Sequence, residues 1–243
     1  MTFAQTDAQR SSLLCGCLVD LEPTRASEHF RRPDVDMLEW RLDLSCRKAG
    51  IDAVESGLSQ LADSNRLPVL VTNRPVREGG SFDGQESARV DILLRAVDAG
   101  AEWVDLEQDV PQEVIDGCQS KGAEVLLSHH DFLATPGPLA LRDLARRLAS
   151  RRPDAIKIVT LAKHPEDNLR VLELIAFARE ECGTPAIAFC MGPLGRWSRA
   201  VCVLLGSPWT YVQLAGLGAA APGQLTAEEM HQLLTVLRGD PPS

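Results

Sequence analysis

The stretch that decides the fold class is AIKIVTLAKHPEDNLRVLELIAFARE, residues 155–180. Its first seven residues form a short apolar run that is typical of a buried strand. Residues 165–180 then show the apolar spacing of an amphipathic helix, and the proline at its start suits a first helical turn. The stretch therefore predicts one strand-then-helix unit, the repeating element of α/β folds.

The same alternation extends from end to end of the chain. Strand candidates lie at residues 13–19, 37–43, 68–74, 103–107, 124–130, 155–161, 185–191 and 209–214. The clearest helical patterns follow at residues 51–62, 87–99, 139–150, 165–180 and 226–237. Eight such units within about 250 residues match the size of a (β/α)₈ barrel.

The competing architecture is an open, doubly wound sheet. Two observations favour the barrel. No G-x-G-x-x-G follows the first strand, and polar residues recur at the C-terminal ends of strands around the whole chain, where a barrel places its active site. We predict a single (β/α)₈ TIM barrel catalytic domain over residues 13–243, after a flexible N-terminal tail at residues 1–12.

Composition narrows the classes of function. The chain has 243 residues and a net charge of −9, with acidic and basic residues interspersed, which argues against binding to nucleic acid or to an anionic membrane. No apolar stretch approaches the roughly 18 residues of a membrane span, and the N-terminus does not resemble a secretory signal, so the expected location is the cytoplasm. The seven cysteines include no C-x-x-C pair, so we expect neither disulfides nor a metal site.

Lys157 is the first candidate for chemistry. It is one of only four lysines and sits inside the apolar run of the sixth strand. Burial disfavours the ammonium form, and the neutral amine is the form that attacks a ketone to give a Schiff base. The alternatives are a lysine that reaches out to solvent or pairs with a buried carboxylate.

Charged residues also gather at the second and third strands. Strand alternation puts Glu39, Arg41 and Asp43 on one face, and because both faces of a barrel strand are buried, they predict a polar site or a paired network. Arg74 ends the third strand and suits an oxyanion or hydroxyl, and Glu78 follows it just before two glycines. A surface ion pair is the alternative for Arg74 and Glu78.

Two later strand ends add an acid–base group and a cation. His129 and His130 point to opposite faces of the fifth strand, so at most one faces the barrel mouth, where histidine is the usual general acid–base group. Arg199 falls in the first turns of the helix after the seventh strand and suits a carboxylate. An ordinary solvated helix residue is the alternative for Arg199.

Taken in order, these pieces resemble the type I 3-dehydroquinate dehydratase family along nearly the whole chain. The matching pieces are Glu39-Trp40-Arg41-Leu42-Asp43, Thr72-Asn73-Arg74 with Glu78-Gly79-Gly80, Ser128-His129-His130-Asp131-Phe132, Lys157, Met191 with Ser198-Arg199, and Ala221-Pro222-Gly223-Gln224. No single piece is decisive, but the serial set is highly specific.

The resemblance implies a (β/α)₈ barrel that usually forms a homodimer and needs no metal or organic cofactor. It implies dehydration of 3-dehydroquinate to 3-dehydroshikimate, in the shikimate pathway, through a lysine imine. In that reading Lys157 forms the imine, His130 is the general acid–base group and Glu78 orients it. The same reading gives substrate-binding roles to Glu39, Arg41, Arg74, Phe189, Met191, Arg199 and Gln224.

The chain departs from the family pattern at two positions. Ala220 stands where the family often has a serine before the lid motif, and Phe189 stands where a methionine is common. The segment at residues 216–223 is rich in glycine and precedes the last helix, so we predict a mobile lid there. A class I Schiff-base aldolase, or a catalytically silent barrel that binds quinate-like ligands, remains the alternative function.

Overall fold

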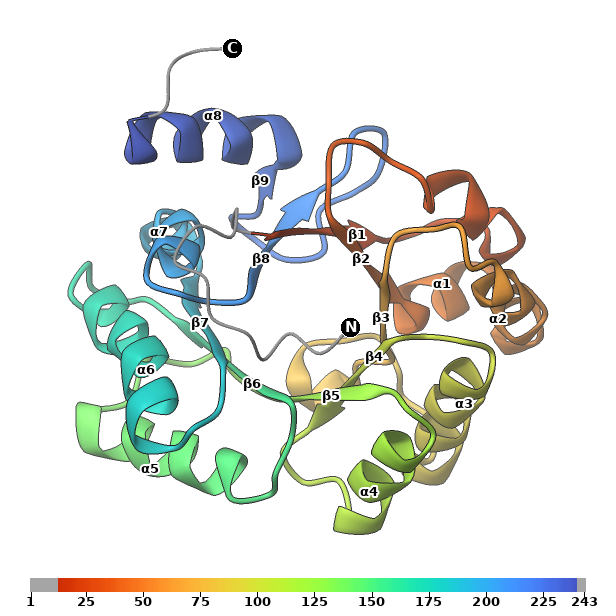
Figure 1. The fold of residues 1–243 in the computed structure, drawn as a ribbon, viewed down its shortest axis with the longest axis horizontal. Coiled ribbons are helices and arrows are strands. Elements are labelled where there is room, and N and C mark those ends of the chain that lie inside the picture. The colour runs from red at the N-terminus through yellow and green to blue at the C-terminus, as the bar shows by residue number, and fades with distance from the viewer. Residues whose placement is uncertain (1–12, 240–243) are drawn as a thin grey trace.

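The computed structural model describes residues 13–239, and its centre is one curled parallel sheet (Figure 1). The strands are β1 (Leu13–Leu18), β2 (Met37–Arg41), β3 (Val69–Thr72), β4 (Trp103–Glu107), β5 (Glu124–Asp131), β6 (Ala155–Leu161), β7 (Ala186–Met191), β8 (Trp209–Gln213) and the short β9 (Leu225–Thr226). Neighbouring strands pair in the order β7-β6-β5-β4-β3-β2-β1-β8-β9. All these pairings are parallel, as strand-then-helix connections require.

Helices surround the sheet on its outer side (Figure 1). The α-helices are α1 (Leu42–Ala49), α2 (Ile51–Leu58), α3 (Glu86–Asp98), α4 (Gln112–Ser120), α5 (Pro138–Ala149), α6 (Asp167–Glu181), α7 (Ser198–Leu204) and α8 (Ala227–Arg238). Short 3₁₀ turns are η1 (Pro23–His29), η2 (Ser59–Ala62), η3 (Val76–Glu78) and η4 (Pro193–Gly195). Within residues 13–239, no helix combines the length and the apolar character that crossing a bilayer requires.

The strands read as apolar runs because both of their faces are buried. Their inner face packs side chain against side chain across the barrel. Trp103 and Trp209, the first residues of β4 and β8, meet edge to face with ring centroids 5.0 Å apart. They fill the N-terminal end of the barrel. The polar residues further along each strand lie closer to the opposite, C-terminal end.

The predicted barrel is confirmed, with one difference in its closure. The strand order leaves β7 at one end of the sheet, and across residues 13–239 no ladder joins β7 to β8. Helix α7 packs against both strands on the outside of this seam. Strand β9 adds to the far edge of β8 through Val212 and Leu225, a pairing that the sequence pattern did not predict.

Two predicted boundaries were wrong in ways that affect the site. The second strand ends at Arg41 rather than at residue 43, and Asp43 lies in the first turn of α1, where a carboxylate is favoured by the helix dipole. The third strand ends at Thr72, so Arg74 lies in the loop beyond it. The predicted tail at residues 1–12 and the last four residues of the predicted domain lie outside the described residues.

Candidate active site

A cavity opens at the C-terminal end of the strands, with ≈ 630 Å³ of empty space when the open solvent at its mouth is counted. All ten residues predicted for the site line this cavity: Glu39, Arg41, Arg74, Glu78, His130, Lys157, Phe189, Met191, Arg199 and Gln224. They come from strands β2, β5, β6 and β7, from the segment after β3, from α7 and from the segment before α8. The barrel therefore brings together residues that are up to 185 positions apart in the sequence.

Lys157 is buried at the centre of the site and is surrounded by groups that favour a cation. Its Nζ donates to Asp105 Oδ2 at 3.1 Å and lies 3.9 Å from Glu39 Oε1. The ring of Tyr211 faces the same nitrogen, with Nζ 4.4 Å from the ring centroid. Burial by itself would raise the pKa of Asp105, but Arg74 and Lys157 hold it at about 2, so Asp105 is a permanent anion beside the amine.

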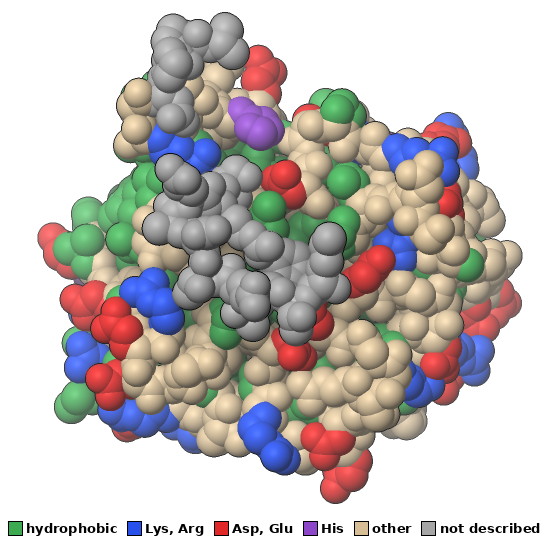
Figure 2. Space-filling model, viewed as in Figure 1, with side chains coloured by type: hydrophobic (Ala, Val, Ile, Leu, Met, Phe, Trp, Pro, Cys, Tyr) green, Lys and Arg blue, Asp and Glu red, His purple; other side chains and the backbone are tan. Residues whose placement is uncertain are grey.

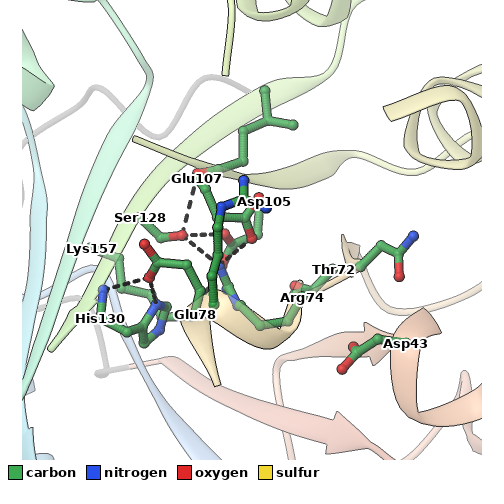
Figure 3. A network of polar contacts seen from close by, with 12 residues as sticks. Asp43, Thr72, Arg74, Glu78, Asp105, Glu107, Ser128, His130 and Lys157 are labelled. Carbon is green, nitrogen blue, oxygen red and sulfur yellow. Dashed lines mark hydrogen bonds and ion pairs between the residues drawn. The ribbon is translucent and has the colours of Figure 1, made fainter. Parts of the chain in front are cut away.

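Arg74 is the hub of a buried polar network (Figure 3). Its guanidinium donates to Asp105 at 2.6 Å and to Glu107 and Ser128 at 2.7 Å each. Arg89 of α3 forms an ion pair with the other oxygen of Glu107 at 2.5 Å. Every charge in this network has an opposite partner, which offsets the desolvation of the buried carboxylates.

His130 and Glu78 form the acid–base unit. The Glu78 carboxylate, which is turned toward His130 in Figure 3, accepts the backbone N–H of His130 at 2.8 Å and lies 3.1 Å from Nδ1 of its ring. Burial lowers the pKa of His130 well below its usual range, and burial raises the pKa of Glu78 to about 7. The ring of His129 is not among the residues that line the cavity, in agreement with the alternation of the strand.

Arg199 differs from the other arginines of the site because no anion neutralises it. Arg41 and Arg74 each form ion pairs with carboxylates, whereas Arg199 forms none with any residue of the described chain. It is only 2% exposed, donates one long hydrogen bond of 3.4 Å to the carbonyl of Pro222, and stacks on the Phe189 ring at 4.5 Å. Burial lowers the pKa of Arg199 to about 10, which still leaves a cation at neutral pH that lacks an anionic partner.

The second strand supplies a carboxylate and a braced arginine. Arg41 donates to both oxygens of Asp43, at 2.9 and 2.8 Å, and Asp43 also accepts the backbone N–H of Ser81. Glu39 accepts from the hydroxyl of Thr72 at 2.9 Å. The prediction of a paired network on this strand therefore holds for Arg41 and Asp43, although Asp43 reaches its partner from α1.

The predicted lid lies over the cavity. Gln224 is buried, and its side chain accepts from the backbone N–H of Ala220 at 2.7 Å and donates to Cys17 Sγ at 3.2 Å. Gly223 has a positive φ of 77°, and a Cβ there would stand 3.1 Å from the carbonyl oxygen of Gly192, in the loop after β7. The lid thus bridges the mouth of the barrel at the seam between β7 and β8.

Sequence reasoning missed three residues of this site: Asp105, Tyr211 and Cys17. Asp105 carries the same signal as Lys157, a charge between apolar neighbours in a buried strand, and could have been found by that rule. Tyr211 and Cys17 read as ordinary core residues, because only the register of the barrel turns them toward the lysine and the lid. In the described part of the chain, no group of three or more His, Cys, Asp or Glu side chains has the arrangement of a metal site.

Comparisons with known proteins bear on the family and the fold of this chain. The model of the type I 3-dehydroquinase family matches residues 21–241. The 3-dehydroquinate dehydratase of Syntrophobacter fumaroxidans is 45% identical over 226 residues, which cover 93% of this chain and 97% of that protein. The enzyme of the same name from Thermococcus gammatolerans is 35% identical over 230 residues, covering 93% and 100%. The crystal structure of 3-dehydroquinate dehydratase from Geobacillus kaustophilus superposes with a TM-score of 0.85 at 26% identity, covering 96% of this chain and 93% of that one.

Proposed function

The chain is a dehydratase of the type I 3-dehydroquinase family, and we propose that it removes water from 3-dehydroquinate through an imine on Lys157, giving 3-dehydroshikimate in the shikimate pathway. The observation that carries this mechanism is the setting of Lys157. It is a buried lysine at the floor of a cavity that also contains a histidine–carboxylate pair and an arginine with no anionic partner. No residue elsewhere in the described chain combines a buried amine with such neighbours.

The surroundings of Lys157 favour a protonated imine. The free amine attacks the ketone carbon, water leaves, and the product is a C=N bond that carries a positive charge once protonated. Asp105, Glu39 and the Tyr211 ring lie around the nitrogen and stabilise a cation there. The protonated imine then withdraws electrons from the neighbouring carbon and makes its hydrogen acidic.

His130 is placed to move the proton. Its low pKa keeps the ring neutral, so that one ring nitrogen is free to take the α-proton of the imine while Nδ1–H donates to Glu78. The enamine that results expels the neighbouring hydroxyl, and His130 returns the proton to that hydroxyl as it leaves as water. Hydrolysis of the imine then releases the conjugated enone and restores Lys157.

Binding of the substrate follows from the charges that the protein leaves open. Among the buried cations of residues 13–239, Arg199 is the one without an anion, so we assign to it the substrate carboxylate. Glu39, Arg41 and Arg74 face the ring hydroxyls, and Gln224 covers the substrate from the lid. Phe189 and Met191 form an apolar wall beside them.

We further propose a homodimer that works in the cytoplasm without a metal or organic cofactor. An exposed apolar surface on η4, the residues after it and α8 supports self-association. It consists of Leu194, Trp197, Leu233, Val236 and Leu237. Figure 2 shows hydrophobic side chains gathered beside α8 and over α7, while charges of both signs are interspersed over the rest of the same face. The seven free cysteines suit a reducing compartment.

The first experiment combines product identity with imine trapping. Incubation with 3-dehydroquinate should produce the ultraviolet absorbance of a conjugated enone, and borohydride added during turnover should inactivate the protein. Peptide mapping should place the reduced ligand on Lys157, and a Lys157→Met variant should neither turn over nor be labelled. Label on the exposed Lys163 instead would contradict the assignment. Carbon–carbon cleavage products would indicate an aldolase.

A further inference from the structure

Cys17 joins the lid to Glu39, the carboxylate that lies near Lys157. It lies on the inner face of β1, is 1% exposed and lines the cavity. Its Sγ accepts a hydrogen bond from Gln224 Nε2 at 3.2 Å and donates to Glu39 Oε2 at 3.4 Å. The thiol of Cys17 therefore accepts from Gln224 of the lid and donates to Glu39 of the site. These two partners are 185 residues apart in the sequence.

The contacts continue in both directions from the thiol. On the lid side, the Gln224 oxygen accepts from the backbone N–H of Ala220 at 2.7 Å, so the lid fixes which end of the amide points at the sulfur. On the other side, Glu39 Oε1 accepts from Thr72 and lies 3.9 Å from Lys157 Nζ. The resulting chain of contacts extends from the backbone of the lid to the reactive amine.

The chemistry of the thiol suits this place in the chain. Burial and the neighbouring Glu39 raise the pKa of Cys17 above its usual range, so the sulfur keeps its proton. A protonated thiol donates one weak hydrogen bond and accepts another, and a hydroxyl can do the same, whereas a methyl group can do neither. Both polar neighbours of Cys17 are buried and need a partner there.

We infer that Cys17 is a positioning residue that couples closure of the lid to the orientation of Glu39 beside Lys157. The inference rests on the proposed function of the same site. When Gln224 lies over the cavity, its side-chain N–H donates to the sulfur of Cys17. The S–H group then points toward Glu39 and donates to its carboxylate. When Gln224 leaves, the S–H is free to rotate, and Glu39 loses a donor that fixes its carboxylate.

Three variants test the role of the hydrogen bonds. Cys17→Ala should lower kcat/KM about three- to tenfold, as expected for the loss of about one net hydrogen bond. Cys17→Ser should stay within about twofold of the parent, because the hydroxyl keeps both functions. Cys15→Ala, two residues away on the same strand and also buried, is the matched control and should leave kcat/KM unchanged. An unaffected Cys17→Ala, or a Cys17→Ser as impaired as Cys17→Ala, would overturn the inference.

A double-mutant cycle tests whether Cys17 acts through the lid. If it does, Cys17→Ala should lower kcat/KM in the parent background but have little further effect in the Gln224→Ala background, whereas Cys15→Ala should have no effect in either background. If the losses of kcat/KM from Cys17→Ala and Gln224→Ala are additive in the double variant, Cys17 does not act through the lid. Borohydride labelling of Lys157 in the parent protein distinguishes failure of the proposed function from failure of the inference about Cys17. If the parent protein neither turns over substrate nor becomes labelled, the proposed function is wrong. If it does both and the cycle is additive, only the inference about Cys17 is wrong.

Discussion

At the scale of single residues, the site is built from buried charges that differ in whether the protein neutralises them. Arg74 and Asp105 are held by several partners each, so they form a fixed frame. Arg199 is left without an anion, and Lys157 lies among groups that favour a cation. Among these side chains, Arg199 is therefore the one whose charge is open to an anion of the substrate.

The anion role of Arg199 gives a prediction about substrate binding. Arg199→Ala should raise KM about ten- to hundredfold, the range expected for a charged hydrogen bond worth about 1.5–3 kcal/mol, with a smaller change in kcat. The carboxylate contact is made in both the ground state and the transition state, which is why KM carries the effect. Arg199→Lys keeps the positive charge but lacks the planar guanidinium, so its KM should lie between that of the parent protein and that of Arg199→Ala. Steady-state kinetics that show an unchanged KM would assign the carboxylate to Arg41 or Arg74.

The His130–Glu78 pair gives a prediction about pH. His130 stays neutral near pH 7 because burial lowers its pKa, so the group that titrates there is Glu78, with a pKa of about 7. As the pH falls through about 7, Glu78 gains a proton and ceases to be a full acceptor for His130, so kcat/KM should fall on the acidic side and reach a plateau on the alkaline side.

Two variants check this assignment. Glu78→Gln should remove the titration near pH 7, because the amide oxygen accepts at every pH, and should lower the plateau roughly ten- to hundredfold through the lost charge. His129→Ala, whose ring lies outside the cavity, should leave the profile unchanged, whereas His130→Ala should lower kcat by about two orders of magnitude or more. Persistence of the titration in Glu78→Gln would show that another group causes it.

At the scale of elements, strand ends and the loops that follow them determine where each functional group lies. Strands β2, β4, β5 and β6 carry Glu39, Asp105, His130 and Lys157, with His130 next to the C-terminal end of its strand and the other three further back. The lid comes from the loop after β8 and reaches across to the loop after β7. The open seam between β7 and β8 is therefore covered at the mouth by the segment that we predict to be mobile.

The lid gives a prediction about motion. Gly216 and Gly223 both have positive φ, and we expect residues 216–224 to be cleaved rapidly by a protease in the free protein and slowly in the presence of product. Ala220→Ser should tighten substrate binding by about 0.5–1.5 kcal/mol, since the hydroxyl adds one hydrogen bond at the cavity wall. Equal cleavage rates with and without product would mean that the segment is a fixed wall.

At the scale of the whole molecule, the exposed apolar surface on η4, the residues after it and α8 predicts self-association. Leu233→Glu and Val236→Glu place charges in that surface and should shift the protein from twice 26.4 kDa toward 26.4 kDa in sedimentation velocity. Leu139→Glu, an exposed leucine on α5, is the control and should leave the mass unchanged. A parent protein that already sediments at 26.4 kDa would rule out the dimer.

The sequence by itself determined the barrel and most of the groups in its site. Alternation of short apolar strands with amphipathic helices is a local property, so it could be read without any knowledge of contacts, as residues 155–180 illustrate. The motifs around Glu39, His130 and Lys157 identified the family because they recur in a fixed order. Strand alternation limited the barrel mouth to one of His129 and His130, since side-chain direction in a strand depends only on position, and the family motif selected His130.

The tertiary structure alone decided which buried charges are paired. Asp105 holds Arg74 and Lys157, and Cys17 joins Gln224 to Glu39, through contacts between elements far apart in the chain. Asp43 braces Arg41 from a helix rather than from the strand, and Arg199 lacks any carboxylate partner in the described chain. These features depend on strand register and on distances of about 3 Å between side chains, and a one-dimensional pattern contains neither quantity.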